Sequence, residues 1–395
     1  MNRFFPILLL TALPTLFLQA DEKSVVWERI YDKALNDQMR YEVMVNIRSL
    51  REPAFVPLLV NALTDVISRR IELGNTNEVD AKVRLATQII DALGDLKDSS
   101  GADLLFQVYK EIKTFPLLRS DAAMALGKAR ASDYAIDLAK ALDSTNLQPD
   151  RDNAKAQEIV AFGLVQALAM MKDPVGFEPT FFASIGWYSP ARKVKEIAKT
   201  MLKLIVDDPT ESLVKIIKTQ NNNLYKLRAL EAEDDSKASP AQKSVAAMAA
   251  LQEGVRLIAN NIVESTRLSD LRKKALDMLI EYQDHTPEYV ATYKDSYHTA
   301  VLAKDNSETL KTLQVLGVNG TPQAVALLTD KMQDFNRRED SKLTSVFDIQ
   351  QIRTILQAFK LANSNAARPV LLEASFLYTP AVQRDIRSVM EGLPQ

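Results

Sequence analysis

Histidine and cysteine, two residue types that commonly carry enzyme chemistry, are scarce in this sequence. Its two histidines, His285 and His298, match no common zinc-binding spacing, and the chain has no cysteine. The sequence also has no glycine-rich phosphate loop, no Gly-x-Ser-x-Gly elbow and no His-Glu-x-x-His motif. We therefore expect no catalytic residue, no metal ligand and no cofactor, and a protein that is not an enzyme.

Carboxylates occur in pairs at Asp207-Asp208 and Asp234-Asp235. Both pairs fall in expected turns or polar segments, where carboxylates commonly cap helices or stay solvated. An enzyme interpretation survives only as a helical-repeat lyase or a regulatory subunit of an enzyme. Either would need a deep pocket lined by convergent polar groups.

Five arginines lie near the starts of expected helices: Arg84, Arg119, Arg192, Arg272 and Arg353. On the inner surface of a helical stack they could form a basic ladder for an acidic partner. Their uneven register favours a structural role instead, in which each arginine bonds a neighbouring repeat or caps a helix carbonyl. All five are candidate partner-binding residues.

The most aromatic segment of the chain runs from Phe177 to Tyr188 and holds five aromatic residues in twelve. Helical spacing predicts a core position for three of its apolar residues, namely Phe181, Phe182 and Ile185. Trp187 and Tyr188 precede the expected helix start at Ser189-Pro190 and are the better candidates for exposure, beside Arg192; burial of the pair between repeats is the alternative. An exposed aromatic pair next to a cation is a combination enriched in binding hot spots.

Charge and the N-terminal segment limit the partners and the location. The chain carries 49 Lys+Arg against 51 Asp+Glu, so no global field attracts nucleic acid. Residues 1–20 combine Arg3 with an apolar stretch and end at Ala20, which is typical of a secretory signal peptide. We expect a mature chain from Asp21, without a later membrane span and located in the periplasm. Secretion, or anchoring by an uncleaved signal, is the alternative.

Apolar residues recur at three- and four-residue steps along almost the whole chain, which predicts amphipathic helices and an all-α fold. One such stripe comprises Val83, Ala86, Ile89, Ile90, Leu93 and Leu96. A second comprises Val194, Ile197, Ala198, Met201, Leu202 and Ile205.

A recurring join links these helices: an apolar helix end runs into a short polar turn and then into another apolar helix. Examples are Ala92-Leu93-Gly94-Asp95-Leu96-Lys97-Asp98 and Ala167-Leu168-Ala169-Met170-Met171-Lys172-Asp173-Pro174. We expect the small residues of the joins to let paired helices approach, and the Asp and Pro residues to end one helix and start the next. Eight joins recur, anchored at Ile47, Leu93, Leu126, Leu168, Leu202, Leu279, Leu316 and Phe359.

The Ala-Leu-Gly, Lys-Asp and Asp-Pro joins resemble those of the HEAT-repeat family, a group of armadillo-like α-solenoids, over roughly residues 38–392. The resemblance implies a superhelical solenoid of about eight to nine antiparallel helix pairs, and the sequence looks like that of an exported bacterial member. The expected organisation is a signal peptide at 1–20, then one continuous solenoid with repeats at 21–219 and 244–395. A related armadillo-like stack is an alternative for some pairs.

Between these two sets of repeats, residues 220–243 break the rhythm with Asn221-Asn222-Asn223 and an acidic cluster around Glu233. We expect a solvated polar insertion, with one possible helical arm from Leu224 to Glu233. The wide interval between Leu202 and Leu279 predicts one degenerate repeat in the stretch that includes Val255, Ile258 and Ile262.

A long repeat surface without a catalytic set predicts a binding protein. We expect a periplasmic scaffold or adaptor for protein partners of the cell envelope. A peripheral binder of the cell wall or the membrane is the alternative, and it would need a contiguous basic or apolar patch.

Overall fold

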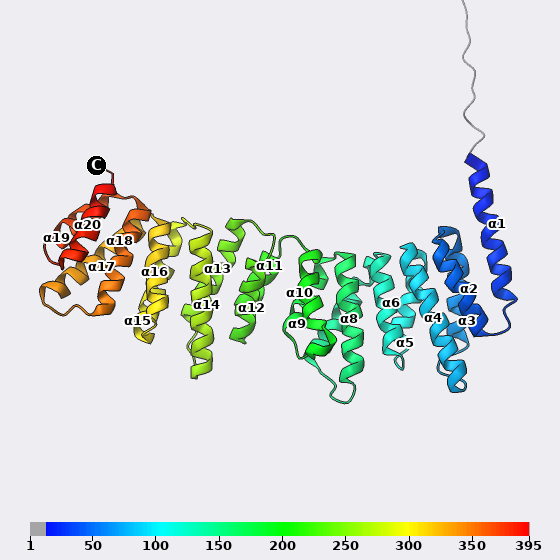
Figure 1. Ribbon diagram of the computed structural model, residues 1–395. Helices are drawn as coiled ribbons and strands as arrows, with labels where there is room; N and C mark the ends of the chain where they lie inside the picture. The colour runs from blue at the N-terminus through cyan, green and yellow to red at the C-terminus, as the bar shows by residue number, and fades with distance from the viewer. Residues whose placement is uncertain (1–12, 395) are drawn as a thin grey trace, which may run out of the picture. The chain divides into compact units, whose positions relative to one another are not determined.

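The computed structural model describes residues 13–394, with side chains from Lys23 onward. All regular structure in this range is helical, which confirms the all-α prediction. Contacts between residues divide the chain into two compact units, with the boundary between Val206 and Asp207. Figure 1 labels the α-helices of both units, all except α7 (Ala135–Leu147).

The first unit contains ten α-helices in its described part: α1 Leu13–Asp32, α2 Asp37–Leu50, α3 Val56–Ser68, α4 Thr76–Leu96, α5 Ala102–Glu111, α6 Pro116–Lys128, α7 Ala135–Leu147, α8 Ala154–Met171, α9 Phe177–Ile185 and α10 Val194–Ile205. One layer is formed by the even-numbered helices α2 to α10, which pack on one another in chain order. The odd-numbered helices α3, α5, α7 and α9 each pack on the even-numbered helix that follows.

The second unit repeats this arrangement over residues 207–394 with ten further α-helices: α11 Thr210–Thr219, α12 Asn223–Asp234, α13 Pro240–Arg256, α14 Ile262–Glu281, α15 Val290–Ala303, α16 Asn306–Asn319, α17 Pro322–Asp340, α18 Val346–Ala362, α19 Arg368–Ala374 and α20 Pro380–Gly392. Here α12, α14, α16, α18 and α20 form one layer, and α11, α13, α15, α17 and α19 form the other. Each described part is therefore a stack of helix pairs, as the repeats predict.

Seven short 3₁₀-helices lie between these elements: Pro53–Phe55, Ser99–Gly101, Ser132–Tyr134, Pro174–Gly176, Pro190–Arg192, Pro287–Tyr289 and Asn365–Ala367. In the joins that begin with Lys97 and Lys172, the lysine takes the left-handed backbone conformation and ends the α-helix. The next residue then caps the 3₁₀-helix: Asp98 Oδ1 accepts a hydrogen bond from the Ser100 amide at 2.8 Å, and Asp173 Oδ1 accepts one from Val175 at 3.0 Å. The predicted role of these aspartates at the helix start is confirmed.

The recurring join connects one helix pair to the next and does not lie within a pair. It leads from an even-numbered helix to the following odd-numbered helix, for example from α4 to α5, whereas the extensive contacts of α5 are with α6. The small residues of the joins likewise lie where helices of neighbouring repeats approach each other closely. A Cβ atom on Gly127 of α6 would lie 2.5 Å from Ala167 Cα of α8. The expectation that these residues bring the two helices of one pair together is therefore wrong.

The expected polar insertion at 220–243 contains the helix predicted from Leu224 to Glu233, but this helix belongs to the repeat stack and is not a solvated arm. Residues 223–234 form α12, which packs against α11, α13 and α14 and buries Lys226, Ala229, Leu230 and Glu233. Lys226 Nζ bonds the carbonyl oxygen of Ile217 and lies 3.0 Å from Glu253 Oε2. The segment looks solvated in sequence because two charged side chains belong to its buried face.

The degenerate repeat expected between Leu202 and Leu279 has its join at the turn between α12 and α13. Ile258 and Ile262, which we assigned to this repeat, are 88% and 85% exposed.

The predicted signal peptide lies mostly outside the described residues. Its first twelve residues are not described, and α1 begins at Leu13. None of the helices in the described range is long and apolar enough to cross a membrane.

Candidate binding groove

The five candidate arginines make separate contacts. Arg119 of α6 donates to the Tyr109 carbonyl oxygen at the end of α5 at 2.8 Å and lies over the Tyr109 ring. Arg353 of α18 pairs with Asp385 of α20 at 3.3 Å, and both side chains are about half exposed. These contacts agree with the structural role, in which an arginine caps a carbonyl or bonds a neighbouring repeat. Arg353 remains accessible to a partner.

Two further arginines of the first unit are exposed. Arg84 Nε lies 3.4 Å from the carbonyl oxygen of Asp80 in its own helix. Arg192 Nε lies 3.7 Å from Glu158 Oε2, in a contact whose guanidinium is 40% exposed. Partner binding by these two arginines stays a prediction.

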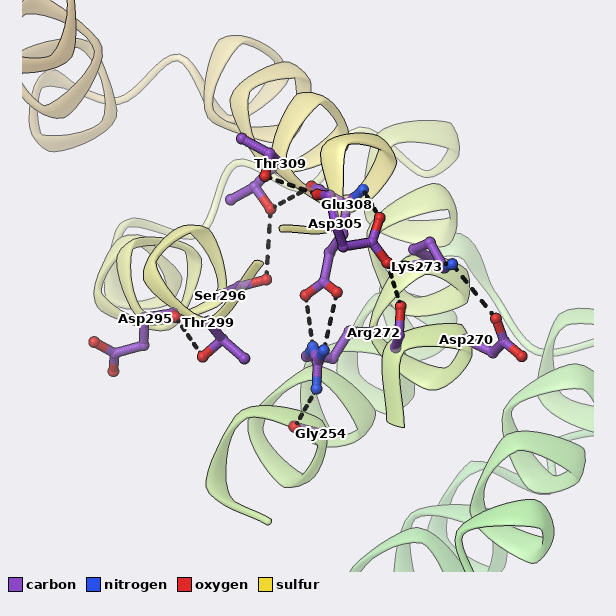
Figure 2. A network of polar contacts seen from close by, with 12 residues as sticks. Gly254, Asp270, Arg272, Lys273, Asp295, Ser296, Thr299, Asp305, Glu308 and Thr309 are labelled. Carbon is purple, nitrogen blue, oxygen red and sulfur yellow. Dashed lines mark hydrogen bonds and ion pairs between the residues drawn. The ribbon is translucent and has the colours of Figure 1, made fainter. Parts of the chain in front are cut away.

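Arg272 is buried, so it cannot meet a partner directly. Figure 2 shows its guanidinium between α14 and α16, where Nε and Nη2 donate to the two carboxylate oxygens of Glu308 at 2.5 and 2.9 Å. Nη1 donates to the Gly254 carbonyl oxygen of α13 at 2.9 Å. Because Arg272 is 5% exposed and Glu308 is fully buried, this bidentate pair fastens helices of the second unit together. The assignment of Arg272 to partner binding is corrected accordingly.

The expected exposed aromatic pair belongs to the core of the first unit. Tyr188 is 1% exposed and donates from its hydroxyl to Asn146 Oδ1 at 2.7 Å. Trp187 is half-buried, and its Nε1 donates to the Thr145 carbonyl oxygen at 3.0 Å. Both residues therefore pack on the end of α7, and burial raises the pKa of the Tyr188 hydroxyl well above its usual value. The prediction of a protruding pair is wrong for Tyr188. Of the three residues assigned to the core, Phe181 is buried, and Phe182 and Ile185 are partly buried.

The paired carboxylates and the histidines make local contacts. Asp208 Oδ1 accepts from the amide of Thr210, the first residue of α11, at 3.1 Å, so it lies at a helix start. Asp234 instead accepts hydrogen bonds from Lys274 and Tyr282, and these contacts hold its pKa below the usual value against the opposing effect of burial. His285 Nδ1 lies 3.2 Å from the Asn319 carbonyl oxygen. Within the described range, no three His, Cys, Asp or Glu side chains are grouped as for a metal ion.

An open groove of about 700 Å³ lies in the second unit between α15, α16, α17 and α18. Tyr297 and Phe335 contribute buried aromatic side chains, and the rim carries the exposed apolar residues Val301 and Leu343. The volume falls within the range of small-molecule sites, about 300 to 1,000 Å³, and can also hold a short peptide segment. The mixture of aromatic, apolar and cationic side chains suits binding.

One tyrosine organises the floor of this groove. The Tyr297 hydroxyl of α15 donates to Gln351 Oε1 of α18 at 2.8 Å. Lys331 Nζ of α17 lies 4.7 Å from the centre of the Tyr297 ring, in a cation–π contact. Burial and the nearby carboxylates of Asp348 and Asp334 raise the pKa of Tyr297 to about 12, so its hydroxyl keeps its proton near neutral pH.

The groove has more cationic than anionic side chains. Lys304, Lys331, Arg337 and Arg338 line it together with two carboxylates, Asp334 and Asp348. Arg338 is 2.8 Å from Asp348, and Arg337 pairs with Asp334. Lys331 reaches only Asp334, at 4.0 Å, and Lys304 has no ion pair among the residues that the structure describes. The two lysines are thus weakly neutralised cations facing an apolar and aromatic surface.

Hydroxyl contacts hold α15 and α16, which carry one wall of the groove. Ser296 Oγ of α15 lies 3.4 Å from Thr312 Oγ1 of α16, and Thr312 Oγ1 donates to the Glu308 carbonyl oxygen at 2.9 Å. The buried Thr309 lines the groove and donates to the Asp305 carbonyl oxygen at 2.8 Å (Figure 2). The wall therefore continues into the network that contains Arg272 and Glu308.

Sequence reasoning missed this groove, although α17 carries a usable signal. Lys331, Asp334, Phe335 and Arg338 follow a helical spacing of three and four residues, so one face of α17 mixes an aromatic ring with cations. The partners on that face come from other helices, and Gln351 lies 54 residues after Tyr297. Local spacing could indicate the α17 stripe but not the groove.

Comparisons with known proteins did not identify a family for this chain. No family model matches the sequence, and no curated protein matches it. Human deoxyhypusine hydroxylase in complex with glycerol is 13% identical, with a TM-score of 0.30 over 87% of this chain and 98% of that chain. An engineered protein is 15% identical, with a TM-score of 0.33 over 94% of this chain and 98% of its own. The molecule is an all-helical repeat protein by its own helix packing.

Proposed function

We propose that this chain is a non-enzymatic HEAT-like scaffold of the bacterial periplasm that binds protein partners of the cell envelope through its repeat surface. The groove between α15 and α18 is the observation that carries the proposal. It is open, it combines aromatic and apolar side chains with lysines that are weakly neutralised, and it lies on regular helices. Rigid aromatic surfaces with adjacent cations are typical of protein-binding sites.

The ionisable groups of the groove support binding in preference to catalysis. Asp348 accepts a hydrogen bond from the Ser345 amide at 2.7 Å and pairs with Arg338, so it is engaged as a helix cap and an ion-pair partner. Asp334 pairs with Arg337 and lies within reach of Lys331. A general base needs a free proton-accepting site directed at a substrate. These carboxylates stabilise the groove instead.

Export is the part of the proposal that rests on residues 1–20 alone. Their charge and apolar stretch support secretion, and removal of the segment would leave Asp21 as the new N-terminus. Cell fractionation and N-terminal sequencing of the full chain test this directly. A cytoplasmic protein that retains Met1 would overturn the assigned location.

In-cell crosslinking with mass spectrometry tests the binding function. We expect a tagged full chain to yield reproducible crosslinks to one or a few envelope proteins, including crosslinks from Lys304 or Lys331. A chain that lacks residues 2–20 is the matched control, because it should stay in the cytoplasm and lose those partners. Failure to recover any reproducible protein partner from the exported chain would contradict the proposed function.

A further inference from the structure

The floor of the groove contains an amide group whose NH₂ makes no hydrogen bond to the described residues and reaches the open groove. Gln351 is 4% exposed and lines the groove. Its Oε1 accepts from the Tyr297 hydroxyl, while its Nε2 bonds nothing among the described residues. This NH₂ can therefore donate a hydrogen bond to an acceptor on an occupant of the groove.

A positive charge lies over the ring of the same tyrosine. Lys331 and Gln351 contact the same tyrosine, the former over the ring and the latter at the hydroxyl. The Lys331 side chain is only 19% exposed, and its nearest carboxylate, at 4.0 Å, also pairs with Arg337. The ammonium and the amide NH₂ are both groups that donate hydrogen bonds to carboxylate oxygens.

The remaining walls are suited to an apolar side chain. Phe347 is half-buried, and Leu343, in the turn between α17 and α18, is 68% exposed. Val301 of α15 contributes a third apolar side chain to the lining. Bidentate binding of a phosphate group would use an arginine guanidinium, but Arg337 and Arg338 each pair with a carboxylate of the groove. These features favour a carboxylate with an apolar neighbour over a phosphate group.

We infer that this groove binds an acidic peptide segment of a protein partner, whose side-chain carboxylate contacts Lys331 and Gln351 while a neighbouring apolar residue packs on Phe347 and Leu343. The inference rests on the proposed function and names the chemistry that the partner must present. It also makes the groove selective, because a neutral amide in place of the carboxylate loses the attraction to Lys331. Screening of that charge makes the interaction weaker at high salt.

Selection from a displayed library of random heptapeptides against the full chain provides the probe. We expect enrichment of sequences in which Asp or Glu neighbours an aromatic or aliphatic residue. The best enriched peptide is then synthesised with its termini blocked, together with a version in which Gln or Asn replaces the acidic residue. Fluorescence anisotropy should give a Kd about tenfold weaker for the neutral version, in line with a charge-assisted hydrogen bond.

Two variants of the protein test the assigned contacts. Lys331→Gln should weaken binding of the acidic peptide about tenfold. Gln351→Glu keeps the acceptor for the Tyr297 hydroxyl and the side-chain shape but removes the donor, so it should weaken the acidic peptide at least as much. Lys294→Gln is the matched control, because it removes the same charge from the exposed face of α15 outside the groove lining, and it should leave the Kd unchanged. Circular dichroism establishes that each variant is folded, and Lys331→Gln alone decides the matter if Gln351→Glu fails to fold.

Several outcomes would overturn the inference. These are no enrichment of acidic peptides, equal binding of the acidic and neutral versions, or equal weakening by Lys331→Gln and Lys294→Gln. Tighter binding of a phosphotyrosine version than of the acidic peptide would assign the groove to phosphate instead. Reproducible crosslinks in cells together with any of these results would leave the proposed scaffold in place and refute only the acidic-peptide groove.

Discussion

The Arg272–Glu308 pair provides the sharpest test of how the second unit is held together. The carboxylate is fully buried, the guanidinium is 5% exposed, and two hydrogen bonds join them (Figure 2). Glu308→Gln would leave a buried cation without its counter-charge, which costs about 3 to 5 kcal/mol. Arg272→Met should cost a similar amount, because it leaves the carboxylate unpaired.

The double variant separates the pair's interaction from the cost of burying each charge. With Arg272→Met and Glu308→Gln combined, no unpaired charge remains, and we expect a loss of only about 0 to 2 kcal/mol relative to the native chain. Urea unfolding followed by circular dichroism measures the free energies. The exposed pair Arg353–Asp385 is the matched control, and Asp385→Asn should cost at most about 1 kcal/mol. Single-variant costs below 1 kcal/mol, or a double variant equal to their sum, would refute the argument.

Three further predictions concern the first unit. Gly127→Ala would place a Cβ atom 2.5 Å from Ala167 Cα and should lower the free energy of unfolding by about 1 to 3 kcal/mol, measured by thermal unfolding. Gly392→Ala is the control and should leave it unchanged, because nothing lies within 4 Å of the added Cβ atom. Equal melting temperatures of the two variants would contradict this prediction. Tyr188→Phe removes the bond to Asn146 and should cost about 1 to 2 kcal/mol in urea unfolding, and an unchanged midpoint would show that the hydroxyl contributes nothing. Burial and Asp91 raise the pKa of Asp121 to about 6 from 3.8, so its contribution to stability is fully present below about pH 4 and is lost as the pH rises through 6. Asp121→Asn should therefore stabilise the chain at pH 7 by about 1 to 2 kcal/mol, after allowance for partial exposure, but not at pH 4, and equal effects at both pH values would refute this assignment.

The helices could be predicted from local spacing because each buries one face. In α4 the predicted stripe is largely buried, as Ala86, Ile89, Ile90 and Leu93 show. For α12 the sequence indicated the helix, as the arm from Leu224 to Glu233, but not its packing, because Lys226 and Glu233 lie on the buried face. Their partners are Ile217, Glu253 and Thr210, which lie in other helices, so sequence spacing makes the segment look solvated.

The candidate sites depended even more on contacts between distant residues. Tyr188 looks exposed because it precedes a helix start, yet it packs on residues of α7 that lie 42 positions earlier. Arg272 looks like a surface cation until Glu308 is placed beside it, 36 residues later. Side-chain type could indicate the aromatic and cationic candidates. Their burial depends on which helices become neighbours in the stack.

Site-specific photo-crosslinking from the groove is the most direct test of the central claim that the second unit binds a protein partner there. A photoreactive phenylalanine analogue replaces Leu343 on the groove rim, or Leu302, which is 84% exposed on α15 outside the groove lining. We predict a discrete protein adduct in cells from position 343 that is absent from position 302 and is strongly reduced when Lys331→Gln is added. Equal adducts from both positions, or an adduct from position 343 whose yield Lys331→Gln leaves unchanged, would contradict the account.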